Sequence, residues 1–238
     1  ITTMALTKED YVQNKYSKVM ELNMPEGYYS FQGFIITNKY FVFSSIKKDE
    51  SETKLLVYDI NTLKPITLDA SLKYNFGHSN DMAYNSKTDE IYVVNGKKIH
   101  VIDGKDFKEK KILEAPIEIT SIAYDNESEE FYFRYMFKGY KYNSKFEKQF
   151  EFNMPTNLTR QSFSLQGDHI YYSCYEFGMA NSFQNSYDGI LEAGANLIYI
   201  YNKNGTLENG IYIPAGYGEL EAMEFDSTKT EKLLEIMD

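Results

Sequence analysis

Short runs of alternating apolar and polar residues recur along the chain, separated by polar turns. One group of such runs covers residues 81–85, 91–94, 98–103 and 110–113. The second and third of these runs are joined by Asn95-Gly96, and an Asn-Gly pair between alternating runs is a strong signal for a β-hairpin. The pattern therefore predicts a unit of four short antiparallel strands.

Similar units follow one another with a period of about 40 residues, which is typical of the blades of a β-propeller. They begin near residues 29, 77, 117, 160 and 219. The last unit has only two predicted strands, and the strand-like run at residues 16–22 is expected to complete it. We therefore predict one all-β domain over residues 1–238, a five-bladed propeller of four-stranded antiparallel blades. The N-terminal strand closes the ring by pairing with the C-terminal blade, and residues 1–15 form a lead-in.

Other architectures fit the pattern less well. A parallel α/β fold needs amphipathic helices between its strands, and none is predicted after residue 15. A β-sandwich fits the strand content but does not predict the period. The composition agrees with an all-β fold, because the chain has 22 Tyr and 16 Phe and both residue types favour strands. A closed ring leaves only short strand edges exposed, so we expect a monomer.

The charge of the chain excludes some classes of partner. There are 25 Lys and Arg against 35 Asp and Glu, a net charge of -10, which argues against nucleic acid and anionic lipid as partners. No apolar run approaches the ~18 residues of a membrane span. The single cysteine, Cys174, excludes a disulfide within the chain. The chain starts at Ile1, which would fit a removed signal peptide, and we expect an extracellular or cell-surface location.

Alignment of the five first strands gives two columns of small or polar residues at the point where each strand begins. The first column holds Gln32, Asn80, Thr120, Gln161 and Glu221, and the second holds Gly33, Asp81, Ser121, Ser162 and Ala222. These residues are expected at the mouth of the central channel, where they hold either ordered water or a ligand. Asp81 and Glu221, with the neighbouring amide oxygens, are a candidate Ca²⁺ site. No other cofactor is predicted.

Two further features are expected on the same face as this ring. The loop at residues 176–195 follows Tyr175 and carries Phe177, Phe183 and Tyr187. Loops of this length are usually functional, although these aromatic side chains could also serve only to pack the loop. His78 precedes a first strand and could contact a ligand or act as an acid or base. Its alternative role is to fix the junction between two blades by a hydrogen bond.

Two segments resemble known propeller families. Gly77-His78-Ser79-Asn80-Asp81-Met82-Ala83-Tyr84-Asn85 resembles a blade of extracellular propellers from Gram-positive bacteria, including helveticin-like proteins. Residues 218–226 are similar to a Glu-x-Glu blade opening that also occurs in gluconolactonase-like and strictosidine-synthase-like propellers. The lactonase resemblance implies a cation held at the channel. Glu221 and Asn80 match that pattern, whereas Thr120 and Gln161 depart from it.

Three functions remain open at this point. The first is a non-catalytic cell-surface module that binds a glycan or wall polymer through tyrosines of this face. The second is a hydrolase, lactonase- or glycosidase-like, that uses Asp81, His78 and Glu221, with or without Ca²⁺. The third is a scaffold that binds another protein. No catalytic residue is assigned, because the chain shows no Ser/His/Asp order, phosphate loop or metal-spaced pair of histidines.

Overall fold

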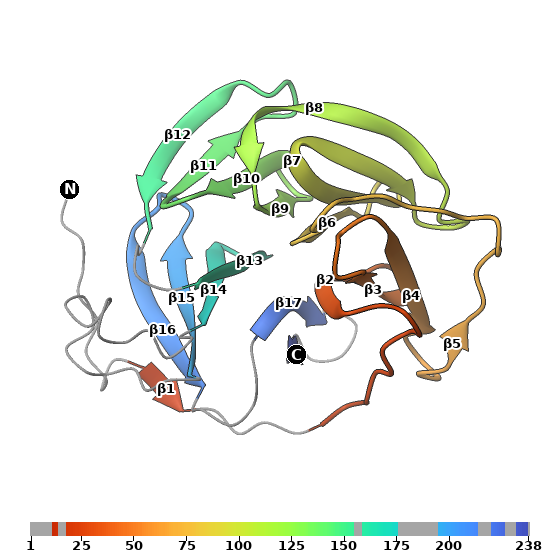
Figure 1. The fold of residues 1–238 in the computed structure, drawn as a ribbon. Coiled ribbons are helices and arrows are strands. Elements are labelled where there is room, and N and C mark those ends of the chain that lie inside the picture. Colours follow the sequence, from red (N-terminus) through yellow and green to blue (C-terminus); the bar gives the residue numbers. More distant parts are fainter. Residues whose placement is uncertain are drawn as a thin grey trace.

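The computed structural model describes residues 11–13, 18–154, 159–175, 195–213, 220–226 and 232–237. Every regular element in these ranges is a β-strand. The strands form small sheets arranged around a common centre, and within each sheet consecutive strands pair antiparallel (Figure 1). The predicted class, an all-β propeller of small antiparallel sheets, is confirmed.

Four sheets have the size of propeller blades, and we number them in chain order. Blade 1 consists of β2 (Ser30–Ile36), β3 (Tyr40–Ile46), β4 (Thr53–Asp59) and β5 (Pro65–Ile66). Blade 2 consists of β6 (Met82–Asn85), β7 (Glu90–Asp103) and β8 (Glu109–Ile119). Blade 3 consists of β9 (Ser121–Asp125), β10 (Glu130–Tyr135), β11 (Lys138–Tyr142) and β12 (Lys148–Asn153). Blade 4 consists of β13 (Thr159–Gln166), β14 (His169–Tyr175), β15 (Asn196–Asn202), β16 (Leu207–Ile213) and β1 (Tyr11–Gln13).

The prediction of five four-stranded blades is wrong for the part of the chain that the structure describes. The fifth unit is a two-stranded sheet of β17 (Leu220–Asp226) and β18 (Lys232–Met237). Blade 2 has three assigned strands, because β7 continues through Asn95 and Gly96, although the 3.1 Å contact between Asn95 Nδ2 and His100 Nε2 shows that the chain turns back within β7. The inner strands nevertheless follow one another around the centre in the order β2, β6, β9, β13 and β17, and β17 contacts β2 again. The repeat therefore predicted the positions of all five inner strands correctly, but it predicted more outer strands than the structure describes.

The predicted closure of the ring by residues 16–22 is not seen among the residues that the structure describes. The N-terminal strand β1 pairs parallel with β16 and extends blade 4, instead of completing the sheet of β17 and β18. The described residues 18–22 belong to no strand. Met20, Leu22 and Met24 instead pack against a buried cluster that combines side chains of blade 1 with Ala222 of β17. These alternating apolar side chains therefore cover the junction between two sheets, although the backbone of this segment pairs with no strand.

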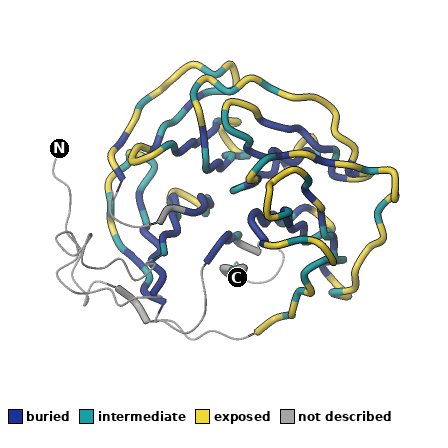
Figure 2. Tube along the Cα trace, in the orientation of Figure 1, coloured by how far each residue is buried: buried dark blue, intermediate teal, exposed yellow. Residues whose placement is uncertain are grey.

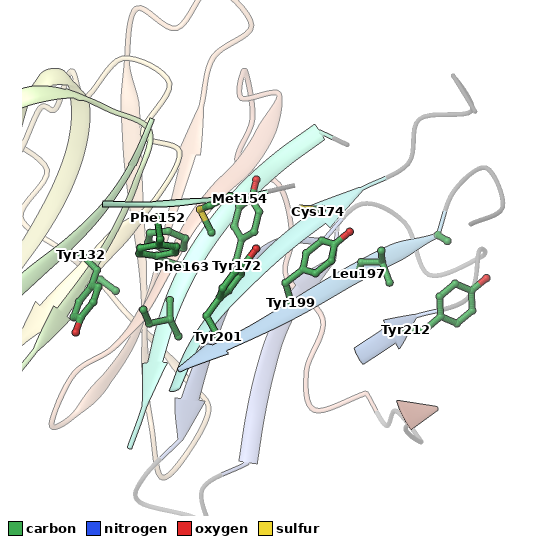
Figure 3. Close-up of a cluster of buried hydrophobic side chains, with 13 residues drawn as sticks. Tyr132, Phe152, Met154, Phe163, Tyr172, Cys174, Leu197, Tyr199, Tyr201 and Tyr212 are labelled. Carbon is green, nitrogen blue, oxygen red and sulfur yellow. The ribbon is translucent and has the colours of Figure 1, made fainter. Parts of the chain in front are cut away.

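Aromatic side chains fill the spaces between neighbouring blades. Figure 2 shows that the inner strands are buried, while exposed residues lie mainly on the outer strands and turns. Between blades 3 and 4, Tyr132, Phe163 and Tyr172 are fully buried in one cluster (Figure 3). The rings of Phe163 and Tyr172 meet edge to face, with centroids 5.6 Å apart. Most of the high Tyr content of the chain is therefore architectural, as expected.

One turn type recurs at the strand connections, and it explains why Asp or Asn ends so many strands. Its first side chain accepts hydrogen bonds from the backbone N–H groups two and three residues later. This turn begins at Asp59, Asn85, Asp103 and Asp125. The fourth residue after each of them has a positive φ, between 52° and 61°. Such a φ disfavours non-glycine residues, and at Phe107 this cost is offset by burial, since only 2% of that residue is exposed.

Replacing Asp103 by alanine tests this turn. The change removes the acceptor of the N–H groups of Lys105 and Asp106, so the free energy of unfolding is expected to fall by about 1 kcal/mol. Urea denaturation followed by circular dichroism measures the change. Asp103→Asn keeps the acceptor oxygen and serves as the matched control. Equal losses in both variants would contradict this account of the turn.

Candidate functional site

Asp81 lies at the centre of the ring of inner strands and is almost fully buried, with 1% of the residue exposed. Its carboxylate accepts backbone N–H bonds from three blades. Oδ1 accepts from Met82 at 3.0 Å, and Oδ2 accepts from Ile122 at 2.9 Å and from Phe163 at 3.0 Å. The side chain predicted as a ligand contact therefore joins the inner strands of blades 2, 3 and 4.

Two other charged side chains interact with Asp81. The guanidinium of Arg134 attracts the carboxylate of Asp81, and Glu224 of β17 repels it. Burial raises the pKa of Asp81 well above its usual value, and its three hydrogen bonds and Arg134 only partly oppose this effect. Burial and the nearby Asp81 carboxylate raise the pKa of Glu224 as well, while a hydrogen bond of 3.2 Å from the Ser164 hydroxyl lowers it. Burial and the mutual repulsion of the two carboxyl groups therefore both favour the binding of a proton at this centre.

The sequence reading did not assign Arg134 or Glu224. Arg134 is buried, and its Nε donates to the Ser121 hydroxyl at 2.9 Å. A signal was present in the sequence, because Arg134 is one of only two arginines and follows the apolar run Phe131-Tyr132-Phe133. Glu224 likewise interrupts an apolar inner strand. The centre therefore combines one arginine, which stabilises the Asp81 carboxylate, with a second carboxyl group that opposes it.

Four other ring residues are brought together by hydrogen bonds. The Nδ2 of Asn80 donates to the backbone oxygens of Thr120 at 2.6 Å and Gln161 at 3.0 Å. The Ser121 hydroxyl donates to the same Gln161 oxygen, and the Thr120 hydroxyl donates to the backbone oxygen of Arg134. These contacts confirm that the aligned columns meet in space, and they use the polar atoms to link blades 2, 3 and 4.

The remaining ring members are buried. The backbone N–H of Ser162 donates to the Ser173 hydroxyl, just as Gly33 donates to Ser44 in blade 1. Gln32 donates from Nε2 to the Ser30 hydroxyl at 2.8 Å. Glu221 is 5% exposed and lies on β17, next to β2. The ring is therefore largely closed to solvent.

The predicted Ca²⁺ ligands fit a cation poorly. A carboxylate offers about four acceptor positions, and three of those on Asp81 are taken by backbone N–H groups. Among the residues that the structure describes, no group of three or more His, Cys, Asp or Glu side chains is arranged to hold a metal ion. No chemical step is therefore derived through a metal at this centre.

His78 lies at the end of the propeller where the inner strands begin, which we call the top face. It is exposed, and its Nδ1 lies within hydrogen-bonding distance, 2.5 Å, of the Oε1 of Glu50 in the β3–β4 connection. This contact places the charged loop of residues 47–52 on the same face as the start of β6. His78 makes its contact at the rim of the face, away from the buried ring.

Two consecutive tyrosines occupy this rim just before β2. The ring centroid of Tyr28 lies 5.7 Å from the Nζ of Lys47 and 6.0 Å from that of Lys54. Tyr29 is 64% exposed, and the Nζ of Lys48 lies 5.8 Å from its ring. We call Tyr28, Tyr29 and these lysines the tyrosine rim. The sequence signal was the pair Tyr28-Tyr29 outside the predicted strands.

The acidic side chains of the same loop are engaged with neighbours. Glu52 pairs with Lys47 at 2.6 Å. Burial, together with a hydrogen bond that its hydroxyl donates to Glu52, raises the pKa of Tyr28. Asp49 accepts from the N–H and hydroxyl of Ser51. Among the described residues, Lys48 and Lys54 form no ion pair with a carboxylate. The rim therefore combines aromatic faces with free ammonium groups, although the chain as a whole is acidic.

A groove with a volume of about 480 Å³ starts beside Tyr28 and follows the outer edge of β4. Its walls are β4, β5 and the segment of residues 67–74. The volume lies within the range of small-ligand sites. The sequence reading did not predict it, because it results from a break in the fourth strand of blade 1.

The remaining predicted residues belong to the connection after β14. Tyr175 ends β14, is half-buried and lies opposite Asn196. Phe177, Phe183 and Tyr187 lie outside the described residues. Among the described residues there is no helix with the length and apolar character needed to cross a bilayer.

Comparison with known proteins supports the fold. No protein-family model matches the chain, and no curated protein sequence is similar to it, so the resemblance to helveticin-like propellers stays a prediction. The fold is similar to the glutaminyl cyclase of Myxococcus xanthus, with a TM-score of 0.58, 10% identity, and coverage of 86% of this chain and 84% of that one. It is also similar to a chain of a nidogen/laminin complex, with a TM-score of 0.52, 10% identity, and coverage of 87% and 72%. At such identity the likeness shows a β-propeller and nothing about activity.

A hydrazine synthase from Kuenenia stuttgartiensis matches at a TM-score of 0.49 and 9% identity, with 87% of this chain covered. The chain spans 55% of the matched hydrazine synthase chain.

Proposed function

We propose that this propeller is a non-catalytic binding module and that its ligand is a glycan or a cell-wall polymer. The observation that carries the proposal is the tyrosine rim. Asp81, Asn80 and Ser121 of the central ring use their polar atoms in links between blades. Tyr29, in contrast, is exposed, and Lys48 lies beside its ring. The ligand contact that we propose is therefore the rim of blade 1 and not the mouth of the channel.

The chemistry of the rim suits a polyhydroxylated chain. A tyrosine ring offers an apolar face for a sugar ring and a hydroxyl for a hydrogen bond. The ammonium groups of Lys48 and Lys54 can donate to sugar hydroxyls or to anionic substituents. An exposed surface at the end of a rigid sheet also allows a polymer to pass across it without threading into a cleft.

Binding to a glycan array and to isolated peptidoglycan, measured with the whole chain, tests the proposal. Tyr29→Ala is expected to weaken binding about tenfold, since loss of a central aromatic contact costs about 1–2 kcal/mol. Phe137→Ala is the matched control, because Phe137 is 40% exposed and lies in the β10–β11 hairpin of blade 3. Absence of any glycan binding would overturn the proposal. A loss in the control variant alone would return the site to another part of the top face.

Two alternatives remain as proposals of lower rank. A lactonase- or glycosidase-like hydrolase would use Asp81, His78 and Glu221 at the channel, with or without Ca²⁺, and the hydrogen bonds that already occupy Asp81 weigh against it. A scaffold that binds another protein would also suit an extracellular or cell-surface propeller. Hydrolysis of a lactone that depends on added Ca²⁺ and is lost in Glu221→Ala would favour the first of these alternatives.

A further inference from the structure

The fourth strand of blade 1 covers only the two ends of the outer edge of β4. At one end β5 pairs Val57 with Ile66 and Tyr58 with Pro65. At the other end Thr53 forms a single bridge with Tyr74. Between these points the segment of residues 67–73 leaves the sheet, and the groove of 480 Å³ occupies the space. The interval from Thr53 to Val57 corresponds to about 13 Å of strand.

The backbone of Leu55 faces this groove. Thr53 donates its N–H outward to Tyr74 at 3.0 Å, and Asp59 donates outward to Lys64 at 2.9 Å. Alternate residues of an antiparallel strand direct both backbone groups to the same side, so Leu55 also directs its N–H and C=O outward. No hydrogen bond from the described residues reaches these two groups on that side. Leu55 is only 4% exposed.

A buried backbone donor and acceptor without protein partners need an explanation, since such groups are nearly always paired. Here they line a groove that is long enough for a few residues of extended chain. An added strand supplies one carbonyl and one N–H at the required spacing, whereas a helix uses these groups internally. The open edge therefore selects an extended polypeptide by its main chain.

The charges around the groove indicate which kind of polypeptide fits. Glu52 and Lys54 lie on the β4 side, and Asp69 and Lys73 lie on the facing segment, so each wall carries one charge of either sign. This balance complements a segment without net charge and gives no attraction for a polyanion. Leu68 and Leu72 pack partly buried beside the groove and leave apolar surface for one side chain of the added strand.

We propose that the groove binds an extended, uncharged peptide segment of a partner protein, which adds to β4 at Leu55. This surface adjoins the tyrosine rim and shares Tyr28 and Lys54 with it, whereas Tyr29 and Lys48 lie outside the groove, and it extends the function beyond the glycan contact. It also gives the protein-binding alternative a defined docking site.

Selection from a linear heptapeptide library on the whole chain tests the inference, with affinities of the selected peptides measured by fluorescence polarisation. Ala70→Trp fills the groove and is expected to weaken binding at least tenfold. Ser144→Trp places the same side chain on an exposed turn of blade 3 and is expected to leave binding unchanged. The peptide is also N-methylated at one position at a time. Binding is expected to be lost when every second position is methylated, because only alternate residues of an added strand donate their N–H to β4. Leu55 amide exchange, followed by NMR, is expected to slow at least tenfold on binding.

Several results would overturn the inference. One is that no peptide is enriched, which would leave only water in the groove. Another is that enriched peptides bind the Ala70→Trp variant equally well or tolerate N-methylation at every position. A third is self-association of the chain that Ala70→Trp abolishes, because the occupant would then be a second copy. Because Tyr29→Ala does not alter the groove, loss of glycan binding in that variant leaves this test unaffected.

Discussion

The Asp81→Ala variant is expected to lose at least ~3 kcal/mol of unfolding free energy. The substitution removes the acceptor of three buried N–H groups, on Met82, Ile122 and Phe163. Each unpaired buried donor costs about 1–3 kcal/mol, and water that enters the space recovers part of this. The variant also leaves the buried Arg134 without its opposing charge, which adds to the loss. Urea denaturation followed by tyrosine fluorescence and by circular dichroism measures the change.

Two further variants separate this role from a general effect of removing charge. Asp81→Asn keeps one acceptor oxygen but turns an NH₂ group toward the remaining N–H groups, so an intermediate loss is expected. Glu26→Ala removes an exposed carboxylate that makes no hydrogen bond or ion pair with the described residues, and it should leave stability nearly unchanged. If Asp81→Ala unfolded at the same urea concentration as the wild type, the hydrogen bonds of Asp81 would not stabilise the ring of inner strands.

The stability of the protein is expected to fall as the pH rises from 5 to 8. Burial raises the pKa of Asp81 and Glu224 well above their usual values, and it raises the pKa of Glu235 to about 7. The folded chain therefore keeps protons that the unfolded chain releases above pH ~4.5. Stability falls with pH wherever the folded state binds more protons. Groups with lowered pKa, such as Asp103 and Asp125, act in the opposite sense but only at lower pH.

Glu235→Gln tests the assignment of this pH dependence. It is expected to raise the free energy of unfolding at pH 8 by roughly 1–3 kcal/mol and to change it little at pH 5. Glu224→Gln should act in the same direction. Glu151→Gln is the control, because lysines lower the pKa of this exposed carboxyl. Thermal unfolding scans between pH 5 and pH 8 give the result, and parallel curves for all variants would contradict it.

The sequence predicted the inner strands well because two signals coincide there. Each strand has an apolar core with a polar residue at its start, and the same order recurs in every unit. Asn80, Thr120 and Gln161 were placed in one column by alignment, and the hydrogen bonds of Asn80 bring them together. The roles of these residues were not predictable in the same way. Asp81 accepts bonds from strands 41 and 82 residues away, and no local pattern encodes such partners.

The outer strands show where local pattern fails. Residues 20, 22 and 24 alternate as a strand would, but their side chains cover a junction between sheets. Tyr11–Gln13 pair with β16 because an open edge is present there, which only the assembled blade provides. The Asn95-Gly96 pair predicts a turn between two strands, and the chain does turn there: Gly96 has a φ of 62°, and Asn95 Nδ2 lies 3.1 Å from His100 Nε2, although β7 is assigned as one element across the turn.

By itself the sequence determined the all-β class, the repeat, the inner strands and the architectural use of tyrosine, since all of these depend on periodicity and composition. Only the tertiary structure decided how many sheets are complete, which edge β1 joins, and that the polar ring links the blades. It also moved the candidate site to the tyrosine rim and revealed the open edge at Leu55. These features depend on which backbone groups and charges remain unpaired after distant segments have met, and that is a property of the assembled fold.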